Sequence, residues 1–205
     1  AEGVGSRALA DNSTAIGSNS VIDATREGGA TLGNNTAIGS NSDGAIAIGG
    51  DPDTNDEETT AATVGNNATN AIAMGTNATV NDNGQNSIAI GNGATISKNS
   101  TASIAMGLNA QVDTSTGVNN AIAIGSDAHA GGSGGIAIGK NAETIGAKTG
   151  AVVIGVNARA EANSIVMGQK AIADSGQAVA IGYSAESHSS YGAAIGRDAY
   201  VGSNS

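Results

Sequence analysis

Two histidines and one acidic cluster are the residues whose chemistry could support a reaction or a metal site in this 205-residue sequence. His129 and His188 lie 59 residues apart. The cluster lies in the segment GDPDTNDEETT, residues 50–60, and consists of Asp51, Asp53, Asp56, Glu57 and Glu58. Carboxylate oxygens suit Ca²⁺, but this spacing matches neither an EF-hand loop nor the calcium-binding nonapeptide of β-helices. We therefore expect solvated histidines and a solvated loop between repeats, with no catalytic residue and no metal site.

Composition excludes several other classes of site and partner. The sequence has no cysteine, so it has neither a disulfide framework nor a thiolate metal site. It contains no Walker-type or dinucleotide-binding glycine motif, and we expect no cofactor. A net charge of −10 with only 8 Lys and Arg argues against nucleic acid and against attraction to anionic lipid. No apolar run has the length of a transmembrane helix, so we expect no direct membrane contact.

A short phrase recurs along the whole chain, as in AIAIG, SIAIG and AIAMG. Each phrase ends on a glycine, and the glycines recur about every 15 residues, a period shorter than that of helical repeats. The fourteen anchor glycines are Gly5, Gly17, Gly33, Gly49, Gly65, Gly75, Gly91, Gly107, Gly125, Gly139, Gly155, Gly168, Gly182 and Gly196. Gly39 is a further match only six residues after Gly33, and the sequence does not decide which of the two is the anchor.

Each repeat has room for two short strands. The apolar phrase alternates with period two, which indicates a strand, and a second alternating segment such as NATVN, residues 77–81, follows the glycine. Stacked strand–turn–strand–loop units form a β-solenoid that rises about 4.8 Å per coil. The sequence therefore predicts an all-β protein with one domain, residues 1–205, of about 14 coils. His129 and His188 would lie roughly 19 Å apart along such a rod and would not share a site.

The apolar phrase predicts two different faces for its strand. Large Ile side chains can fill the solenoid interior, which leaves the alternating Ala side chains pointing outward. A column of outward alanines would form an apolar patch larger than monomers normally carry, so we expect copies of the chain to bury it in a cyclic homo-oligomer. The predicted interface residues are Ala71, Ala73, Ala89, Ala105, Ala121, Ala123, Ala137 and Ala180.

Turn residues follow each phrase. The closing glycine suits a positive φ or a close approach of a neighbouring backbone. Asparagine two residues later tolerates the left-handed region and can form ladders between coils. These asparagines are Asn19, Asn41, Asn77, Asn109, Asn141 and Asn157.

The phrase NSTAIGSNS, residues 12–20, resembles the NSVAIGxxS repeat of the YadA-like heads of trimeric autotransporter adhesins from Gram-negative bacteria. NSIAIG, residues 86–91, matches closely and NSIVMG, residues 163–168, more loosely. The resemblance covers essentially the whole chain. It implies a left-handed parallel β-roll, a homotrimer, and a fibre of which this sequence is the head. The neck, the stalk and the C-terminal anchor in the outer membrane do not occur in the sequence, so we expect it to be a fragment of that fibre.

The family also implies a function. YadA-like heads bind extracellular-matrix proteins such as collagen, fibronectin or laminin, and they mediate cell attachment and autoagglutination at the bacterial surface. The ligand-binding residues that the motif match implies are Asn12, Ser13, Ala15, Ile16, Gly17, Ser20, Asn86, Ser87, Ile88, Ala89, Ile90, Gly91, Asn163 and Ser164. The repeat is also structural in itself, as strand and turn.

The repeat also allows other interpretations of function. The chain could be a structural spacer or a self-associating biofilm segment without a host ligand. A hexapeptide acyltransferase is disfavoured by the period and by the placement of the histidines, and an ice-binding solenoid by the scatter of threonine. Three tyrosines, Tyr183, Tyr191 and Tyr200, lie in the last 23 residues. They either anchor a partner or pack against a following neck.

Overall fold

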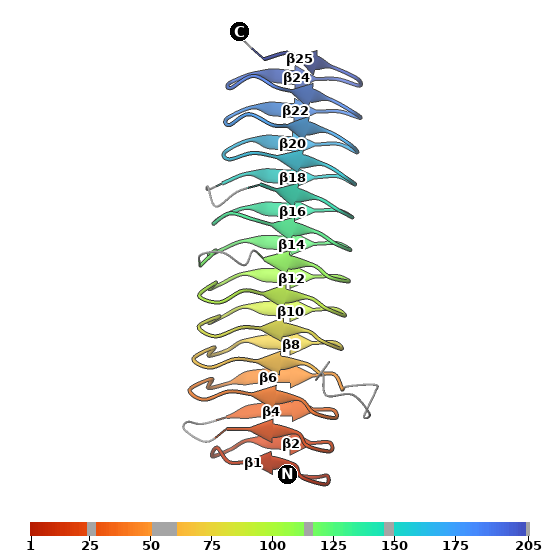
Figure 1. The fold of residues 1–205 in the computed structure, drawn as a ribbon. Helices are drawn as coiled ribbons and strands as arrows, with labels where there is room; N and C mark the ends of the chain where they lie inside the picture. The colour runs from red at the N-terminus through yellow and green to blue at the C-terminus, as the bar shows by residue number, and fades with distance from the viewer. Residues whose placement is uncertain (24–27, 51–60, 113–116, 146–149, 204–205) are drawn as a thin grey trace.

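The chain is a rod of stacked β-coils in the computed structural model (Figure 1). The structure describes residues 1–23, 28–50, 61–112, 117–145 and 150–203. Each coil contributes one strand to each of two parallel sheets, and no helix occurs among the described residues. The same residues therefore include no helical segment long and apolar enough to cross a membrane. The prediction of an all-β parallel solenoid is confirmed.

Sheet A contains the even-numbered strands, each of which carries the apolar phrase of its repeat. Its twelve strands are β2 (Thr14–Ile16), β4 (Gly29–Leu32), β6 (Ala45–Ile48), β8 (Ile72–Met74), β10 (Ile88–Ile90), β12 (Ile104–Met106), β14 (Ile122–Ile124), β16 (Ile136–Ile138), β18 (Val152–Ile154), β20 (Ile165–Met167), β22 (Val179–Ile181) and β24 (Ala193–Ile195).

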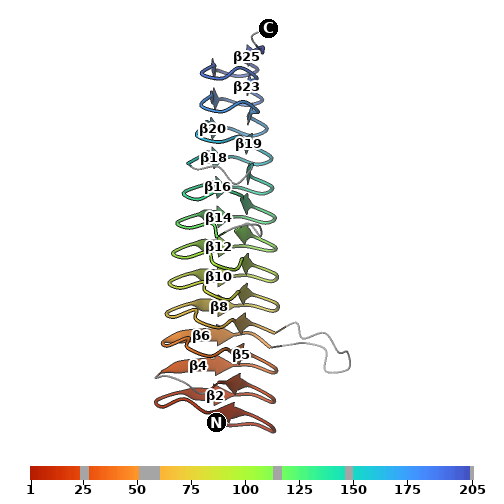
Figure 2. The ribbon, with the colours of Figure 1, turned by 60° about the vertical axis from the view of Figure 1, so that its left-hand side comes forward.

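Sheet B contains the odd-numbered strands, which come from the second segment of each repeat. Its thirteen strands are β1 (Arg7–Ala8), β3 (Val21–Ile22), β5 (Ala37–Ile38), β7 (Thr63–Val64), β9 (Thr79–Val80), β11 (Thr95–Ile96), β13 (Gln111–Val112), β15 (His129–Ala130), β17 (Glu143–Thr144), β19 (Arg159–Ala160), β21 (Ile172–Ala173), β23 (Glu186–Ser187) and β25 (Tyr200–Val201). Figure 2 shows the two sheets on opposite sides of the rod.

Equivalent residues of successive coils stack in register. Ala89 pairs with Ala105, and Ala105 pairs with Ala123. The described strands number twelve in one sheet and thirteen in the other, so the expected count of about 14 coils is slightly too high. The excess arises from Gly65, which follows a strand of sheet B and is not an anchor. Gly49 and Gly75 stack directly on each other, so no further closing glycine lies between them.

The structure identifies which glycines close the turns. Gly33 has a φ of +137° and packs against the backbone of Gly49 and Gly50, whereas Gly39 follows β5 in the other sheet. Gly33 is therefore the anchor. At the start of the chain the stacked residue is Gly3, with a φ of +125°, and not Gly5.

The interior is a thin layer of small side chains. The middle residue of most strands in sheet A is an alanine with no exposed surface, such as Ala89 or Ala123. In the N-terminal half, the buried positions of sheet B hold larger residues, such as Val112 and Ile96, which also have no exposed surface. From β15 to β23 these positions hold Ala, Thr or Ser. The turn between β8 and β9 has only four residues, Gly75–Ala78. Such a short turn keeps the sheets close together, and an alanine on one side leaves room for a valine or isoleucine on the other.

The predicted orientation of the apolar phrase is therefore wrong. All eight predicted interface alanines, residues 71, 73, 89, 105, 121, 123, 137 and 180, have no exposed surface and point into the rod. The isoleucines point outward and are only partly covered, as Ile88 and Ile90 are. Period-two alternation distinguishes the two faces of a strand but does not say which of them faces inward. The narrow coil decides this, because it has space for the smaller side chain.

The predicted turn chemistry is confirmed. The six predicted asparagines have φ values between +51° and +56°, in the left-handed region that asparagine tolerates. Five of them follow closing glycines, and Asn41 follows Gly39 at the opposite edge. Amide ladders also connect the coils at the opposite edge, where Asn83 donates to Asn99 at 2.8 Å and Asn67 donates to Asn83 at 3.2 Å. These bonds satisfy exposed side-chain amides along the rod.

Candidate functional site

The outward side chains of sheet A form a continuous apolar surface, which we call the apolar face. Two columns make up this face, one from the first and one from the third position of the three-residue strands. In the middle of the rod the first column holds Ile88, Ile104 and Ile122. The second column runs through Ile90 and Met106. Within the described strands of sheet A, no outward position carries an ionisable side chain.

A single chain leaves the apolar face open to solvent. Many residues along it are between 38% and 50% exposed, including Ile16, Leu32, Met106 and Ile154. The parallel register places these side chains next to one another for almost the full length of the rod (Figure 1). A contiguous apolar surface of this extent is typical of an interaction site. The apolar face is therefore a candidate interface between chains.

The outward side chains of sheet B form a second surface of opposite character, which we call the polar face. Thr63, Thr79 and Thr95 stack in register on it. Beyond Gln111 its outward residues become charged, and His129, Glu143 and Arg159 follow one another in the same column. The N-terminal half of the polar face is thus mostly neutral, and the C-terminal half carries ionisable groups.

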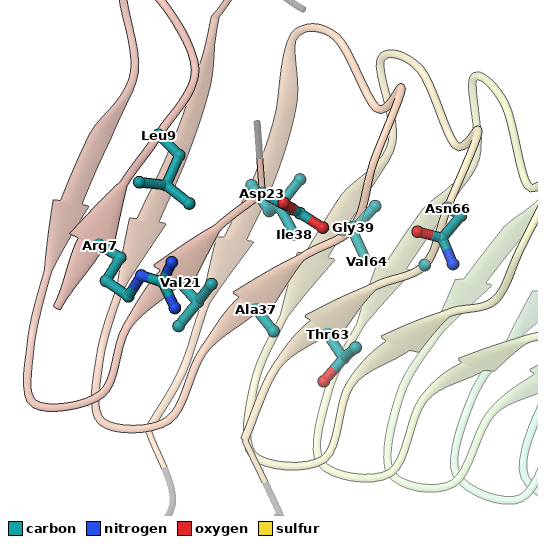
Figure 3. Close-up of a pocket in the computed structure, with 11 residues that line it drawn as sticks. Arg7, Leu9, Val21, Asp23, Ala37, Ile38, Gly39, Thr63, Val64 and Asn66 are labelled. Atoms are coloured by element: carbon teal, nitrogen blue, oxygen red, sulfur yellow. The ribbon is translucent and has the colours of Figure 1, made fainter. Parts of the chain in front are cut away.

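A shallow groove of about 400 Å³ crosses the polar face near the N-terminus (Figure 3). The small residues Ala37, Gly39 and Gly65 line it, and Leu9 and Val21 line its N-terminal side. Its lining residues are Arg7, Leu9, Val21, Asp23, Ala37, Ile38, Gly39, Thr63, Val64, Gly65 and Asn66. A groove of this kind can take a small apolar side chain between polar edges.

Polar groups at the groove's edge are held by bonds between coils. The backbone N–H of Ser40 donates to Oδ1 of Asn66 at 2.9 Å, and the backbone N–H of Asn66 donates to Oδ1 of Asp82 at 2.9 Å. The latter bond is the main cause that lowers the pKa of Asp82, and Lys98, 3.3 Å away, also lowers it. The edge of the groove is consequently rigid and partly charged at neutral pH.

The two histidines lie on the polar face, four coils apart, in β15 and just after β23. This agrees with the prediction that they would not share a site. Groups of three or more His, Cys, Asp or Glu side chains that could hold a metal ion do not occur in the described parts of the chain. The acidic cluster at residues 51–58 lies outside the described residues. His188 is not simply solvated, because it pairs with two carboxylates.

The structure divides the predicted ligand-binding residues between the interior and the surface. Ala15, Ser20, Ser87, Ala89 and Ser164 have no exposed surface. The serines among them bond to neighbouring coils, as when Ser164 Oγ donates to the carbonyl of Ser175 at 3.0 Å. These side chains hold the coil together and cannot touch a partner.

The exposed members of the motif lie at an edge of the rod and on the apolar face. Asn12, Asn86 and Asn163 occupy exposed turn positions with positive φ, just before their strands of sheet A. Ile16, Ile88 and Ile90 belong to the apolar face. The motif thus positions three amides in different coils and does not gather them into one pocket.

The tyrosines lie on different sides of the last coils. Tyr183 is at the edge that follows sheet A, where the guanidinium of Arg197 lies 5.4 Å from its ring centroid. Tyr191 is 78% exposed at the opposite edge, and Tyr200 is on the polar face next to His188. They do not converge on one aromatic site.

Comparison with known families gives one match. The model described as the YadA head domain repeat matches residues 3–20, 67–94, 119–142 and 161–185. Between the second and third matched stretches, β12 pairs in register with β10 before it and β14 after it. A search of curated proteins gave no significant match.

Proposed function

Because this chain is a YadA-like head domain of the trimeric autotransporter adhesins, we propose that three copies form the adhesive head of a bacterial surface fibre that binds host extracellular matrix. The family is one of adhesins at the bacterial cell surface and not of enzymes. Collagen, fibronectin or laminin is the proposed ligand class, and cell attachment or autoagglutination is the outcome. A C-terminal region outside this sequence would anchor the fibre in the outer membrane.

The apolar face is the observation that carries the proposal. Residues such as Ile16, Leu32 and Met106 remain about 40–50% exposed in one chain, and burying them is favourable by about 25 cal/mol per Å². Cyclic symmetry lets three copies cover the same face in a closed assembly. The proposed interface consists of the outward isoleucines and methionines and not of the alanines.

Trimer formation would orient the other surfaces toward the host. With the apolar faces inside, three polar faces and their asparagine-rich edges point outward. The proposed contacts are the exposed motif residues Asn12, Asn86 and Asn163, repeated in several coils and in three chains. Many weak contacts of this kind raise the overall avidity without a deep pocket. The charge of −10 per chain favours encounter with basic segments of the ligand.

Solid-phase binding of the purified chain to collagen, fibronectin and laminin tests the proposal. We expect saturable binding to at least one of them. A triple variant, Asn12→Gly, Asn86→Gly and Asn163→Gly, should weaken that binding while the mass of the assembly stays unchanged. Glycine keeps the positive φ at these positions and removes the side-chain amide, which at Asn86 also accepts a hydrogen bond from Nδ2 of Asn70 at 3.3 Å. Unaltered binding by this variant would exclude these asparagines as contacts.

The second candidate function is a structural spacer or self-associating segment. The apolar face favours it equally, because that face extends over almost all the described coils and explains association of the chain with itself. Self-association without binding to any of the three matrix proteins would support this function over the first. Light scattering of the same samples distinguishes a discrete trimer from larger aggregates.

A further inference from the structure

An ion cluster at the C-terminal end of the polar face connects three successive coils. His188 follows β23, and its ring lies between the side chain of Asp174, which follows β21, and that of Glu186 in β23 itself. The distances are 2.6 Å from Nδ1 to Oδ2 of Asp174 and 3.0 Å from Nε2 to Oε2 of Glu186. Tyr200, the first residue of β25, packs its ring 5.2 Å from the imidazole.

The geometry of this cluster determines the protonation state of His188. An ionised carboxylate can only accept hydrogen bonds. Both ring nitrogens face a carboxylate oxygen at bonding distance, so both must donate. Only the imidazolium carries two N–H groups. The arrangement is therefore complete only when His188 is positively charged.

The surrounding groups reinforce this preference. Glu161 follows β19 one coil before Asp174, and its backbone N–H donates to Ala173 at 2.8 Å, which places a third carboxylate in the same column. The neighbours of Glu186 in the register are the uncharged Ile172 and Tyr200. The cation of β19, Arg159, pairs with Glu143 at 3.2 Å. Glu143 lies in the preceding coil, on the side away from His188. Negative charge thus prevails around His188, and its pKa is raised above the usual value, chiefly by Glu186 and then by Asp174.

His129 provides a contrast within the same sheet. It is outward in β15 and lies 3.7 Å from Glu143, a carboxylate that Arg159 also contacts at 3.2 Å. The two histidines therefore differ in position and in partners. His129 lies within its strand, in the same column as Glu143, whereas His188 follows its strand and lies between two carboxylates.

We propose that His188 is a proton-dependent clamp that fastens the last three coils of the rod, so that this end is tight when the imidazole is charged and loosens when it is neutral. Loss of the proton removes one of the two hydrogen bonds and leaves Asp174 and Glu186 beside a neutral ring. Because the folded-state pKa is raised, the clamp is fully present below about pH 6.5, the ordinary value for histidine. It is lost as the pH rises through the higher folded value.

Hydrogen exchange of the full chain, measured by mass spectrometry between pH 5.5 and pH 8.5 and corrected for the intrinsic rate, tests the clamp. In the wild type we expect protection of peptides that contain β21–β25 to fall several-fold as the pH rises. Peptides that contain β7–β11 should not change. His188→Gln should abolish the pH dependence at the C-terminal end, while His129→Gln should leave it as in the wild type.

A second measurement begins with the wild-type chain. Nuclear magnetic resonance titration of its ring signals should place the titration of His188 above the ordinary histidine value of about 6.5. Glu186→Gln should lower the titration of His188. Titration of His188 at the ordinary histidine value, or the same exchange profile in the wild type and in His188→Gln, would overturn the proposal. Both readouts are independent of matrix binding.

Discussion

The closing glycines form a column in which the backbones of successive coils approach so closely that no side chain fits. Gly107 has a φ of +136°, and a Cβ added there would lie 2.5 Å from the carbonyl oxygen of Gly125. Gly125 has the same relation to Gly139, at 2.6 Å. Conformation and contact therefore both require glycine at these positions.

Substitution of Gly196 measures the effect of the positive φ apart from the effect of the contact between coils. It has a similar φ of +122° but nothing within 4 Å of an added Cβ, because it lies in the last coil. Gly196→Ala should therefore cost only the strain, about 1–3 kcal/mol. Gly107→Ala should cost clearly more, because the alanine would also push two coils apart. Chemical denaturation followed by circular dichroism measures both, and equal losses of stability would show that the contact between coils adds nothing.

Most buried serines among the described residues bond across coils, but Ser187 does not. Ser164 donates to the carbonyl of Ser175 and accepts from the N–H of Ala178, both at 3.0 Å. Ser187 is equally buried, but its hydroxyl has no partner. A buried hydroxyl without a hydrogen bond costs free energy that an alanine would not.

Ser187→Ala should therefore leave the free energy of unfolding unchanged or raise it by about 1 kcal/mol, whereas Ser164→Ala should lower it by about 1–3 kcal/mol. Both serines have no exposed surface, but Ser164 lies just before β20 and has two hydrogen bonds, whereas Ser187 lies within β23 and has none. Thermal unfolding measured in parallel for both variants checks this. A loss of stability in Ser187→Ala as large as that in Ser164→Ala would mean that the hydroxyl of Ser187 has a partner in solution.

The sequence predicts the strands of this fold well but not which way they face. Local residue types predict the repeat period, the two strands of each coil and the asparagines with left-handed φ values. The structure shows all three features. The interior does not follow, because Ile122 and Ala123 alternate in the same way whichever of them points inward. Only the width of the coil determines which side chain faces the interior, and the stacked turns set that width. The pairing of Asp174 with His188 was predictable in principle, because the two are 14 residues apart, the local spacing from Gly168 to Gly182.

Exchange of residue sizes within one strand tests the observed orientation. Ala123 lies inside between Ala105 and Ala137, so Ala123→Ile should overpack the layer and destabilise the chain by about 1–3 kcal/mol. Ile122→Ala, on the apolar face, should leave the coil folded and weaken association between chains. Denaturation and light scattering distinguish the two effects. The opposite pattern would restore the orientation in which isoleucine faces inward.

The whole rod is two-sided, with an uncharged surface on sheet A and a surface on sheet B whose charge is confined mostly to the C-terminal half. This polarity explains how a chain with a charge of −10 could associate with itself. No ionisable side chain lies within the described strands of sheet A, so three copies could meet at the apolar face without burying an ion. The thin interior has few large side chains, and association would supply the burial that the single chain lacks.

Charge placed on one side of the rod or the other should therefore have different effects on assembly. We expect the wild type to have about three times the 19.5 kDa chain mass in light scattering. Ile90→Asp combined with Ile124→Asp should reduce this to the mass of one chain, because two carboxylates would have to be buried in the interface. Thr79→Asp combined with Thr95→Asp adds the same charge at a similar level of the polar face and should leave the mass unchanged. A wild type with the mass of a single chain, or a loss of assembly in both double variants, would contradict an interface formed by the apolar face.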